Sequence, residues 1–181
     1  MHEAIRCPNP MERPDNDTYF MRMAELVATK SKDPSTKVGC VIVGPDNEVR
    51  STGFNGLPRG VEDRPNRYDD RALKYEMIVH AEVNAVAHAA RIGASLKGCT
   101  AYVLRPPCSM CAACFIQAGV DDIRCIEPPA EWLVSDKWGK NLRLAQTMLL
   151  EAGIMLRFYC LLEDGERYQV SVATLPPMAP R

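Results

Sequence analysis

Two short motifs in the chain carry residue types that bind a metal ion. The first places Glu82 two residues after His80, and the second is PCSMC at residues 107–111, which contains Cys108 and Cys111. The two cysteines are one helical turn apart, so both sulfurs can reach one point, and a helix start favours their thiolate forms. Zinc takes sulfur and nitrogen together, and three protein ligands leave a fourth position for water. The spacing predicts one catalytic zinc ion held by His80, Cys108 and Cys111.

Glu82 is close enough to this site to act on bound water without being a ligand. Zinc lowers the pKa of its water toward about 7, and a neighbouring carboxylate can accept the proton. The pattern H-x-E followed by P-C-x-x-C is the signature of zinc deaminases, which attack an amine-bearing base carbon. We expect Glu82 to protonate the ring nitrogen beside that carbon and then to deliver a proton to the departing ammonia.

Other interpretations of these residues remain open. A Cys-x-x-Cys pair with a remote His also builds structural zinc clips, and the pair alone occurs in thioredoxin-like redox sites. Cys114 continues the cysteine series and is an alternative ligand, although a small buried thiol is its ordinary role. His88 has no ligand partner at the right spacing, which favours a hydrogen-bonded or exposed helix side chain. Glu82 and Pro107 favour catalysis, because a structural clip requires neither.

Alternating helices and strands must hold these residues in place. Apolar and β-branched runs predict strands at residues 38–43, 48–54, 100–104, 123–126 and 154–159, and helical spacing predicts helices at about 20–27, from just before 80 to 92, 108–118 and 141–152. The first two strands should form a hairpin around the turn at residues 44–47. The fold class predicted is α/β: a three-layer α/β/α sandwich with a mixed five-stranded sheet.

The length of 181 residues and a hydrophobic share of 46% indicate one compact domain. We expect a zinc-dependent deaminase domain at residues 17–162, a flexible N-terminal segment at residues 1–16 and a C-terminal tail at residues 163–181. The segment 55–70 is rich in Gly, Pro, Asp, Asn and Arg, so we expect a functional loop there.

Charge and composition narrow the partners and the compartment. A net charge of −1 provides no general field for a polynucleotide, so any phosphate must meet a few placed cations. No apolar run approaches the roughly 18 to 20 residues of a membrane helix, and the first residues lack the apolar stretch of a signal peptide. Four of the eight cysteines lie in apolar runs, which fits a reducing compartment: Cys40, Cys99, Cys125 and Cys160. We expect a cytoplasmic protein without polymeric nucleic-acid or membrane partners.

Four stretches resemble the deoxycytidylate (dCMP) deaminases of the cytidine deaminase superfamily. They are SKDPSTKVGCVIV, STGFNGLPRG, VHAEVNAVAHAARIGASLKGCTAYV and PPCSMCAACFIQAGVDDI, and the resemblance as a whole extends over roughly residues 17–159. The resemblance implies hydrolysis of dCMP to dUMP with release of ammonia. It also implies His80, Cys108 and Cys111 as ligands of one zinc ion and Glu82 as the acid/base, in agreement with the chemical argument.

The same resemblance implies contacts with the substrate. Asn55 would meet the sugar hydroxyl, the backbone amide of Ala81 would bond the base carbonyl, and Val38 would pack against the base. Each residue also has an ordinary interpretation, since Asn55 suits a turn and the other two suit packing.

Phosphate and effector contacts would need cations near these motifs. Lys37, Arg59 and Arg105 are the nearby cations, although such residues are more often solvated surface charges than ligands. Arg91 falls where some regulated family members place a gating arginine, and a surface charge late in a helix explains it equally well. Some members respond to dCTP and dTTP bound at a subunit interface of a hexamer. The resemblance therefore implies a small-molecule nucleotide substrate, these effectors, and a homo-oligomer of which a hexamer is one form.

The chain departs from the family pattern before the metal-binding histidine. Some relatives build a second, structural zinc site from Cys and His in this region, whereas residues 55–79 contain neither. Phe54 stands where Tyr is frequent, and Tyr75 is followed by Glu and Met in place of Pro and Tyr. Other functions therefore stay open: deamination of another cytosine nucleotide or nucleoside, of a purine base or of transfer-RNA adenosine, or a zinc-stabilised binding module without turnover.

Overall fold

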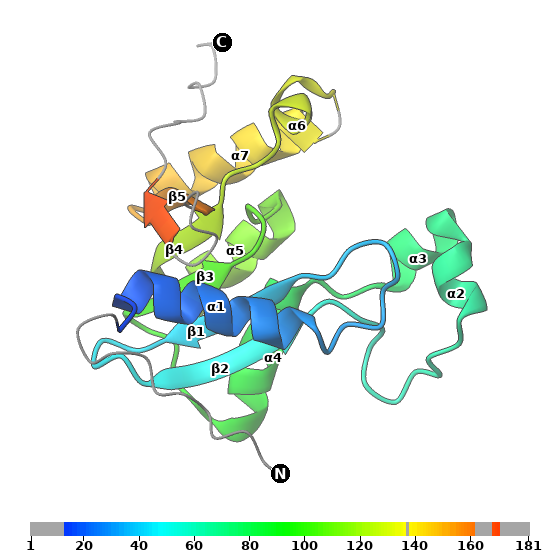
Figure 1. Ribbon diagram of the computed structural model, residues 1–181, viewed down its shortest axis with the longest axis horizontal. Coiled ribbons are helices and arrows are strands. Elements are labelled where there is room, and N and C mark those ends of the chain that lie inside the picture. The colour runs from blue at the N-terminus through cyan, green and yellow to red at the C-terminus, as the bar shows by residue number, and fades with distance from the viewer. Residues whose placement is uncertain (1–12, 137, 162–167, 171–181) are drawn as a thin grey trace.

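The structure is a computed structural model that describes residues 13–136, 138–161 and 168–170. The helices are α1 (Asn16–Ala28), α2 (Asn66–Asp69), α3 (Arg71–Met77), α4 (Ala81–Ile92), α5 (Ser109–Ala118), α6 (Ala130–Val134) and α7 (Trp138–Glu151). The strands are β1 (Gly39–Val43), β2 (Val49–Phe54), β3 (Cys99–Val103), β4 (Val120–Ile126), β5 (Met155–Leu161) and β6 (Tyr168–Val170). Figure 1 shows their arrangement.

All six strands form one mixed sheet in the order β2-β1-β3-β4-β5-β6. β1 is antiparallel to both β2 and β3, whereas β3, β4 and β5 run parallel to one another. The five expected strands correspond to β1 through β5, which confirms the mixed α/β sheet. β6 pairs antiparallel with β5 and adds a short strand within the predicted tail.

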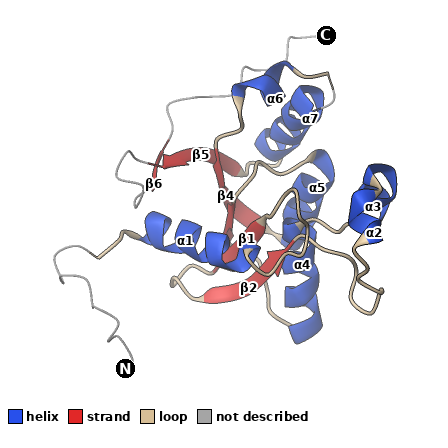
Figure 2. Cartoon of the chain, turned by 45° about the vertical axis from the view of Figure 1, so that its right-hand side comes forward, coloured by secondary structure: helices blue, strands red, loops and turns tan. Residues whose placement is uncertain are grey.

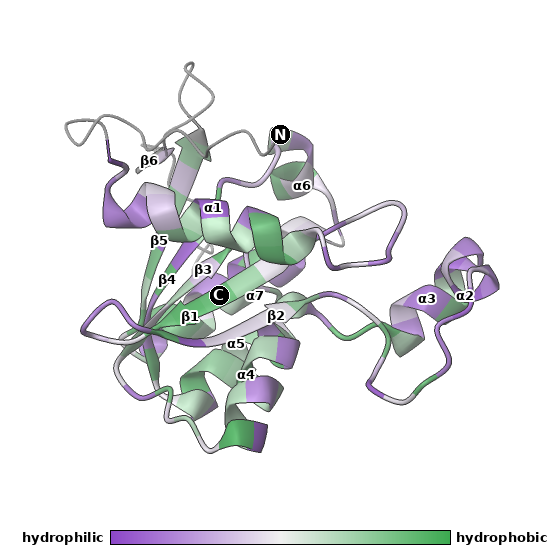
Figure 3. Ribbon diagram, turned by 60° about the horizontal axis from the view of Figure 1, so that its bottom comes forward, coloured by the Kyte–Doolittle hydropathy of each residue, from purple (hydrophilic) through white to green (hydrophobic). Residues whose placement is uncertain are grey.

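Helices cover both faces of the sheet, which confirms the three layers. α1 packs on one face, where Phe20 joins a core that includes Val41 and Tyr102. α4, α5 and α7 cover the other face, whose core includes Ala85 and Phe115, and Figure 2 shows α1 and α4 on opposite sides of the sheet. β1 is buried along its whole length because both of its faces are covered. It is drawn in hydrophobic green in Figure 3.

Local signals decide where the helices begin and end. The Asp15 side chain accepts a hydrogen bond of 2.7 Å from the backbone N–H of Thr18 and caps α1. Gly119 has a φ of 79° and ends α5 in the left-handed conformation, as expected. His80 and Cys108 are the N-cap residues of α4 and α5. The metal-binding motifs therefore lie at helix starts.

Three short helices were not predicted: α2, α3 and α6. α2 and α3 follow a segment of Gly, Pro and charged residues, which hides helical periodicity. All three helices are also too short to show a clear repeat. Asp70 caps α3 by accepting hydrogen bonds of 3.0 and 3.1 Å from the N–H groups of Ala72 and Leu73. α2 and α3 stand apart from the sheet in Figures 1 and 2, and Figure 3 shows α2 as largely hydrophilic.

The predicted domain boundaries fall near the limits of the described residues. α1 begins at Asn16, inside the segment predicted to be flexible, and residues 1–12 lie outside the described chain, as does the tail apart from β6. Cys40, Cys99 and Cys125 are free thiols and are buried, as their apolar strands indicate. Within the same residues, no helix has the length and apolar character needed to cross a bilayer.

Candidate metal centre and substrate cavity

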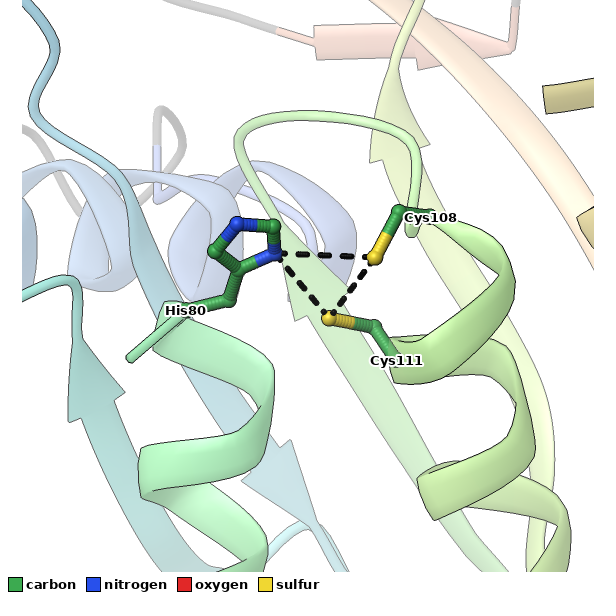
Figure 4. Close-up of side chains that lie close together, drawn as sticks. All are labelled: His80, Cys108 and Cys111. Atoms are coloured by element: carbon green, nitrogen blue, oxygen red, sulfur yellow. Dashed lines mark hydrogen bonds between the residues drawn. The ribbon is translucent and has the colours of Figure 1, made fainter. Parts of the chain in front are cut away.

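Three donor atoms from two helix starts meet at one point, as Figure 4 shows. Cys111 lies in the first turn of α5, one turn after Cys108. The Nδ1 atom of His80 is 3.6 Å from the sulfur of Cys108 and 3.3 Å from that of Cys111, and the two sulfurs are 3.5 Å apart. The residues form a group that could hold one metal ion.

These spacings and donor types fit zinc. Tetrahedral zinc, with bonds of about 2.3 Å to sulfur and about 2.0 to 2.1 Å to nitrogen, places two sulfurs about 3.8 Å apart and a sulfur and a nitrogen about 3.6 Å apart. The observed separations of 3.3 to 3.6 Å are within about 0.3 Å of those values. Three protein donors leave one coordination position for water, which is the pattern of a catalytic site.

Backbone and amide contacts hold both helix starts in place. Val79, just before the histidine, exchanges two backbone hydrogen bonds with Gly56, of 2.8 and 3.1 Å. Asn84 in α4 donates a 2.8 Å hydrogen bond to a carbonyl at the end of β2. On the cysteine side, the N–H of Ser109 donates to Asn141 Oδ1 of α7 at 2.9 Å, and the Asn141 amide donates back to the serine hydroxyl at 3.2 Å. α7 thus fixes the start of the cysteine helix.

The protein alone already polarises the two thiols. Hydrogen bonds from the Cys111 thiol and from the His80 ring lower the pKa of Cys108 to about 4. The hydrogen bond to Cys108 in turn raises the pKa of the Cys111 thiol, with burial acting in the same direction. Cys108 also raises the pKa of His80, because its sulfur accepts a hydrogen bond from the His80 ring. A divalent cation held by these residues would replace the shared protons, since coordination deprotonates thiols outright.

Glu82 lies beside this group, in the first turn of α4. Its side chain is only 4% exposed. Burial raises the pKa of this carboxyl group, although the positive charge of His80 opposes the shift. A buried carboxyl group with a raised pKa, next to a site for water, suits a group that takes up and returns a proton.

The metal group opens into a cavity of about 550 Å³, a size that suits a small organic ligand. His80, Cys108 and Glu82 all line it, as do the three residues predicted from the resemblance to contact sugar and base: Asn55, Ala81 and Val38. The backbone N–H of Ala81 belongs to the first turn of α4, where N–H groups lack partners within the helix. The structure therefore brings together the metal donors, the acid/base candidate and the predicted substrate contacts.

Asn55 also has a structural role within this cavity. Its Oδ1 atom accepts a hydrogen bond of 2.8 Å from the N–H of Val38, and its Nδ2 atom donates one of 2.9 Å to the carbonyl of Thr36. The amide thereby fixes the segment before β1 against the end of β2. This agrees with the turn role considered for Asn55, and its contact with a sugar stays a prediction.

A buried ion pair stabilises the same wall of the cavity. The carboxylate of Asp33 is 2.8 Å from the ammonium of Lys74, and the two side chains are 1% and 10% exposed. Burial tends to raise the pKa of Asp33, but hydrogen bonds from Lys74 and from Ser35 outweigh it and hold the pKa below its usual value. The Lys74 ammonium also donates a 2.6 Å hydrogen bond to the Ser35 hydroxyl. The pair connects α3 to the loop before β1.

The four predicted cations differ in their positions. Arg105 lines the cavity, and its guanidinium lies 4.9 Å from the centre of the Trp132 ring. Lys37, Arg59 and Arg91 are exposed and do not line the cavity. A contact with an effector at these three residues stays a prediction.

Several cavity residues were not predicted from the sequence. They include the two tryptophans and further side chains of α2, α3 and the loop before β1: Asp33, Ser35, Tyr68, Asp69, Arg71, Lys74, Tyr75, Trp132 and Trp138. The two tryptophans are the only ones in the chain. Their rarity is the only feature of the sequence that could have drawn attention to them. The expected functional loop does contribute Tyr68 and Asp69.

The remaining metal-binding candidates have other surroundings. Cys114 is partly buried and does not belong to the group of residues that could hold a metal. The Nδ1 atom of His88 is 3.4 Å from the Ser51 hydroxyl, which matches the hydrogen-bonded helix histidine that was expected.

The arrangement matches solved structures of deaminases. A dCMP deaminase from the cyanophage S-TIM5 superposes with a TM-score of 0.61 and 22% sequence identity, covering 80% of this chain and 97% of that one. This similarity establishes the fold. The shared fold and the His-Cys-Cys donor set define an α/β protein with a candidate zinc site.

Sequence comparisons then identify the family. The profile described as the cytidine and deoxycytidylate deaminase zinc-binding region matches residues 14–127. An uncharacterized deaminase from the luxG 3′ region of Aliivibrio fischeri is 43% identical over 135 residues, covering 75% of this chain and 87% of the relative. Mouse deoxycytidylate deaminase is 40% identical over 110 residues, covering 58% of this chain and 61% of the mouse protein. This chain belongs to the cytidine and deoxycytidylate deaminase family, and zinc is its cofactor.

Proposed function

We propose that the protein hydrolyses dCMP to dUMP and releases ammonia, with His80, Cys108 and Cys111 as the ligands of one zinc ion. The observation that carries this proposal is the placement of three zinc-spaced donor atoms beside a buried carboxyl group at one cavity. Identity of 40% to mouse deoxycytidylate deaminase supports the choice of dCMP, although this chain spans only 61% of that protein's length.

The residues of the chain divide the work of the reaction. A bound zinc ion supplies an activated water for hydrolysis. Glu82 accepts a proton from this water and donates it to the ring nitrogen next to the amine-bearing carbon. It then takes up the second proton, from the added hydroxyl group, and delivers it to the amino group, which leaves as ammonia while the carbonyl forms. The N–H of Ala81 holds the base carbonyl, and Val38 packs against the base. Asn55 orients the sugar while it supports the loop before β1.

The substrate class, the cellular location, the effectors and the oligomeric state are also part of the proposal. The substrate is a small-molecule nucleotide, and the buried free thiols of Cys40, Cys99 and Cys125 fit a cytoplasmic location. Regulation by dCTP and dTTP, with Arg91 as a gating residue, and assembly into a homo-oligomer such as a hexamer stay predictions from the family resemblance.

The test is ammonia release by the zinc-loaded protein with dCMP, CMP, deoxycytidine, guanine and adenosine as separate substrates. We expect the largest kcat/KM for dCMP. The matched control is Glu82→Gln, which keeps the shape of the side chain but cannot carry the proton. This variant should retain zinc and lose activity by about 10²- to 10⁴-fold.

Two results would contradict the proposal. A clear preference for guanine or adenosine would replace dCMP as the substrate. Activity near the wild-type level in the Glu82→Gln variant would remove the proton route through this carboxyl group.

A further inference from the structure

The two tryptophans build one wall of the cavity. Their ring centres are 5.3 Å apart and their planes differ by 16°, so the rings are stacked. α6 supplies Trp132 and the start of α7 supplies Trp138; these two helices lie next to each other in Figure 1. Ser135 tightens the turn between them, because its hydroxyl accepts a 3.1 Å hydrogen bond from the N–H of Trp138 and donates one of 3.0 Å to the carbonyl of Trp132.

This wall lies beyond the part of the chain that defines the family. The family profile ends at residue 127, before both tryptophans. The wall is nevertheless coupled to the metal site, since Asn141 of α7 forms two hydrogen bonds with Ser109, next to a metal-binding cysteine. A feature outside the family's common region that lines the reaction cavity is placed to set substrate preference.

Arg105 is the cation that this wall holds. Its guanidinium lies over the Trp132 ring at 4.9 Å, a distance at which a cation is attracted to the ring face. Stacking on an aromatic ring orients the planar guanidinium and leaves its edge N–H donors available for a bidentate anion. In the described part of the chain, Arg105 forms no ion pair with a carboxylate.

The other cations of the cavity are engaged differently. Lys74 is neutralised by Asp33 at 2.8 Å. Arg71 directs its guanidinium to the Tyr75 hydroxyl of its own helix, with hydrogen bonds of 3.2 and 3.0 Å. Arg105 is therefore the cation whose hydrogen-bonding capacity is best preserved for a ligand.

We propose that Arg105, oriented by the face of Trp132, binds the 5′-phosphate of the substrate and makes the enzyme select nucleotides over nucleosides. This rests on the proposed function, because it assumes that the base occupies the metal end of the cavity. The tryptophan stack acts as a positioning platform: Trp132 restricts the guanidinium, and Trp138 supports Trp132.

The test compares binding of dUMP and deoxyuridine, the product with and without its phosphate, to the zinc-loaded protein by calorimetric titration and displacement. Replacing Arg105 by Gln should weaken dUMP binding by about 10- to 100-fold, the usual loss when a hydrogen-bonded charge partner is removed. Deoxyuridine binding should change by less than about 2-fold, because it lacks the group that the arginine recognises. Arg105→Lys should fall between wild type and Arg105→Gln, since a lysine keeps charge but loses bidentate geometry.

Two further variants test whether phosphate binding depends on the tryptophan platform or only on positive charge in the cavity. Trp132→Leu should weaken dUMP binding by about 2- to 30-fold and leave deoxyuridine unchanged, as expected for loss of a cation–ring contact. Arg71→Gln is the matched control and should leave the ratio of dUMP to deoxyuridine affinity unchanged. Zinc content is measured for every variant, because Arg105 is close in sequence to Cys108.

The outcomes separate this proposal from the function on which it rests. Unchanged dUMP affinity in Arg105→Gln, equal weakening of both ligands, or a selective loss in Arg71→Gln would overturn the assignment. Failure of the wild-type protein to release ammonia from dCMP would overturn the proposed function instead. The comparison of dUMP with deoxyuridine would still report phosphate recognition by Arg105.

Discussion

Single side chains decide the ligand set of the metal site. α5 and its N-cap residue carry three cysteines at intervals of three residues, so spacing alone permits more than one pair as ligands. The structure places Cys108 and Cys111 within 3.6 Å of the His80 ring nitrogen, and Cys114 is not part of that group. A helix advances about 5.4 Å per turn, so a cysteine two turns from the helix start lies too deep along the axis to share the ion.

This difference predicts distinct effects of two cysteine substitutions. Cys108→Ala should abolish stoichiometric zinc binding and deaminase activity, because two ligands hold zinc far more weakly than three. Cys114→Ala is the matched control on the same helix and should retain about one zinc per chain. Elemental analysis of both purified variants measures the result. Zinc retained in Cys108→Ala but lost in Cys114→Ala would reassign the ligands.

Local spacing in the sequence predicts which of these residues lie together, whereas their roles as zinc ligands and acid/base stay predictions. His80, Glu82, Cys108 and Cys111 form short motifs. The structure brings the first three to one cavity and places Cys111 in the candidate metal-binding group with His80 and Cys108. The stacking of Arg105 on Trp132 joins residues 27 positions apart (132 minus 105). Their proximity depends on the unpredicted helix α6 and the turn that follows it. No periodicity in the sequence reports such a contact.

Close packing of elements determines the position of α4, the helix that carries the proposed acid/base Glu82. A Cβ atom on Gly53 of β2 would lie 2.3 Å from the carbonyl oxygen of Ala81 and 2.3 Å from the backbone nitrogen of Ala85. The strand thus touches the backbone of α4 directly, in the turn that carries Glu82. Only a residue without a side chain permits this approach.

We expect Gly53→Ala to displace α4 and to lower activity as well as stability. Overpacking of this kind costs about 1 to 3 kcal/mol of unfolding free energy, and the displacement moves Glu82 relative to the zinc ligands. Gly56→Ala is the control, because its added Cβ would meet only the Phe54 ring, at 3.9 Å. Urea unfolding and kcat/KM of the two variants provide the measurement. Equal behaviour of both variants would exclude the steric explanation.

Prediction of elements depended on how much apolar surface each one buries. β1 is buried on both faces and reads as the continuous apolar run GCVIV, and α1 and α4 show helical periodicity around a distinct N-cap or C-cap. α2 buries no side chain, and β6 has only three residues. Such elements leave no pattern in the sequence, because their positions depend on tertiary contacts.

At the scale of the whole molecule, one polar cluster joins four distant segments on the α1 face of the sheet. Asp17 of α1 accepts hydrogen bonds from the hydroxyls of Tyr102 in β3, at 2.9 Å, and Tyr159 in β5, at 2.7 Å. It also forms an ion pair with Arg124 of β4. Burial tends to raise the pKa of Asp17, but the tyrosine hydrogen bonds and the charge of Arg124 outweigh it, so the pKa lies below the ordinary value of 3.8.

This cluster predicts a pH-dependent contribution to stability. Because folding lowers the pKa of Asp17, its contribution is complete above about pH 4 and is lost as the pH falls through the folded-state pKa. Asp17→Asn should therefore be less stable than wild type by about 1 to 3 kcal/mol at pH 7, since tyrosine and arginine donors lose a charged acceptor. The gap between the two proteins should narrow below about pH 4.

Urea unfolding at pH 7, 5 and 3 measures this gap, and zinc loss in acid affects both proteins alike. Asp121→Asn is the control and should show a constant difference from wild type. Asp121 is an exposed carboxylate at the start of β4 that forms no ion pair among the described residues. A gap for Asp17→Asn that is equally constant from pH 7 to pH 3 would mean that its charge does not hold α1 to the sheet. The α1 layer would then be held mainly by its apolar contacts, which include those of Phe20 and Met21.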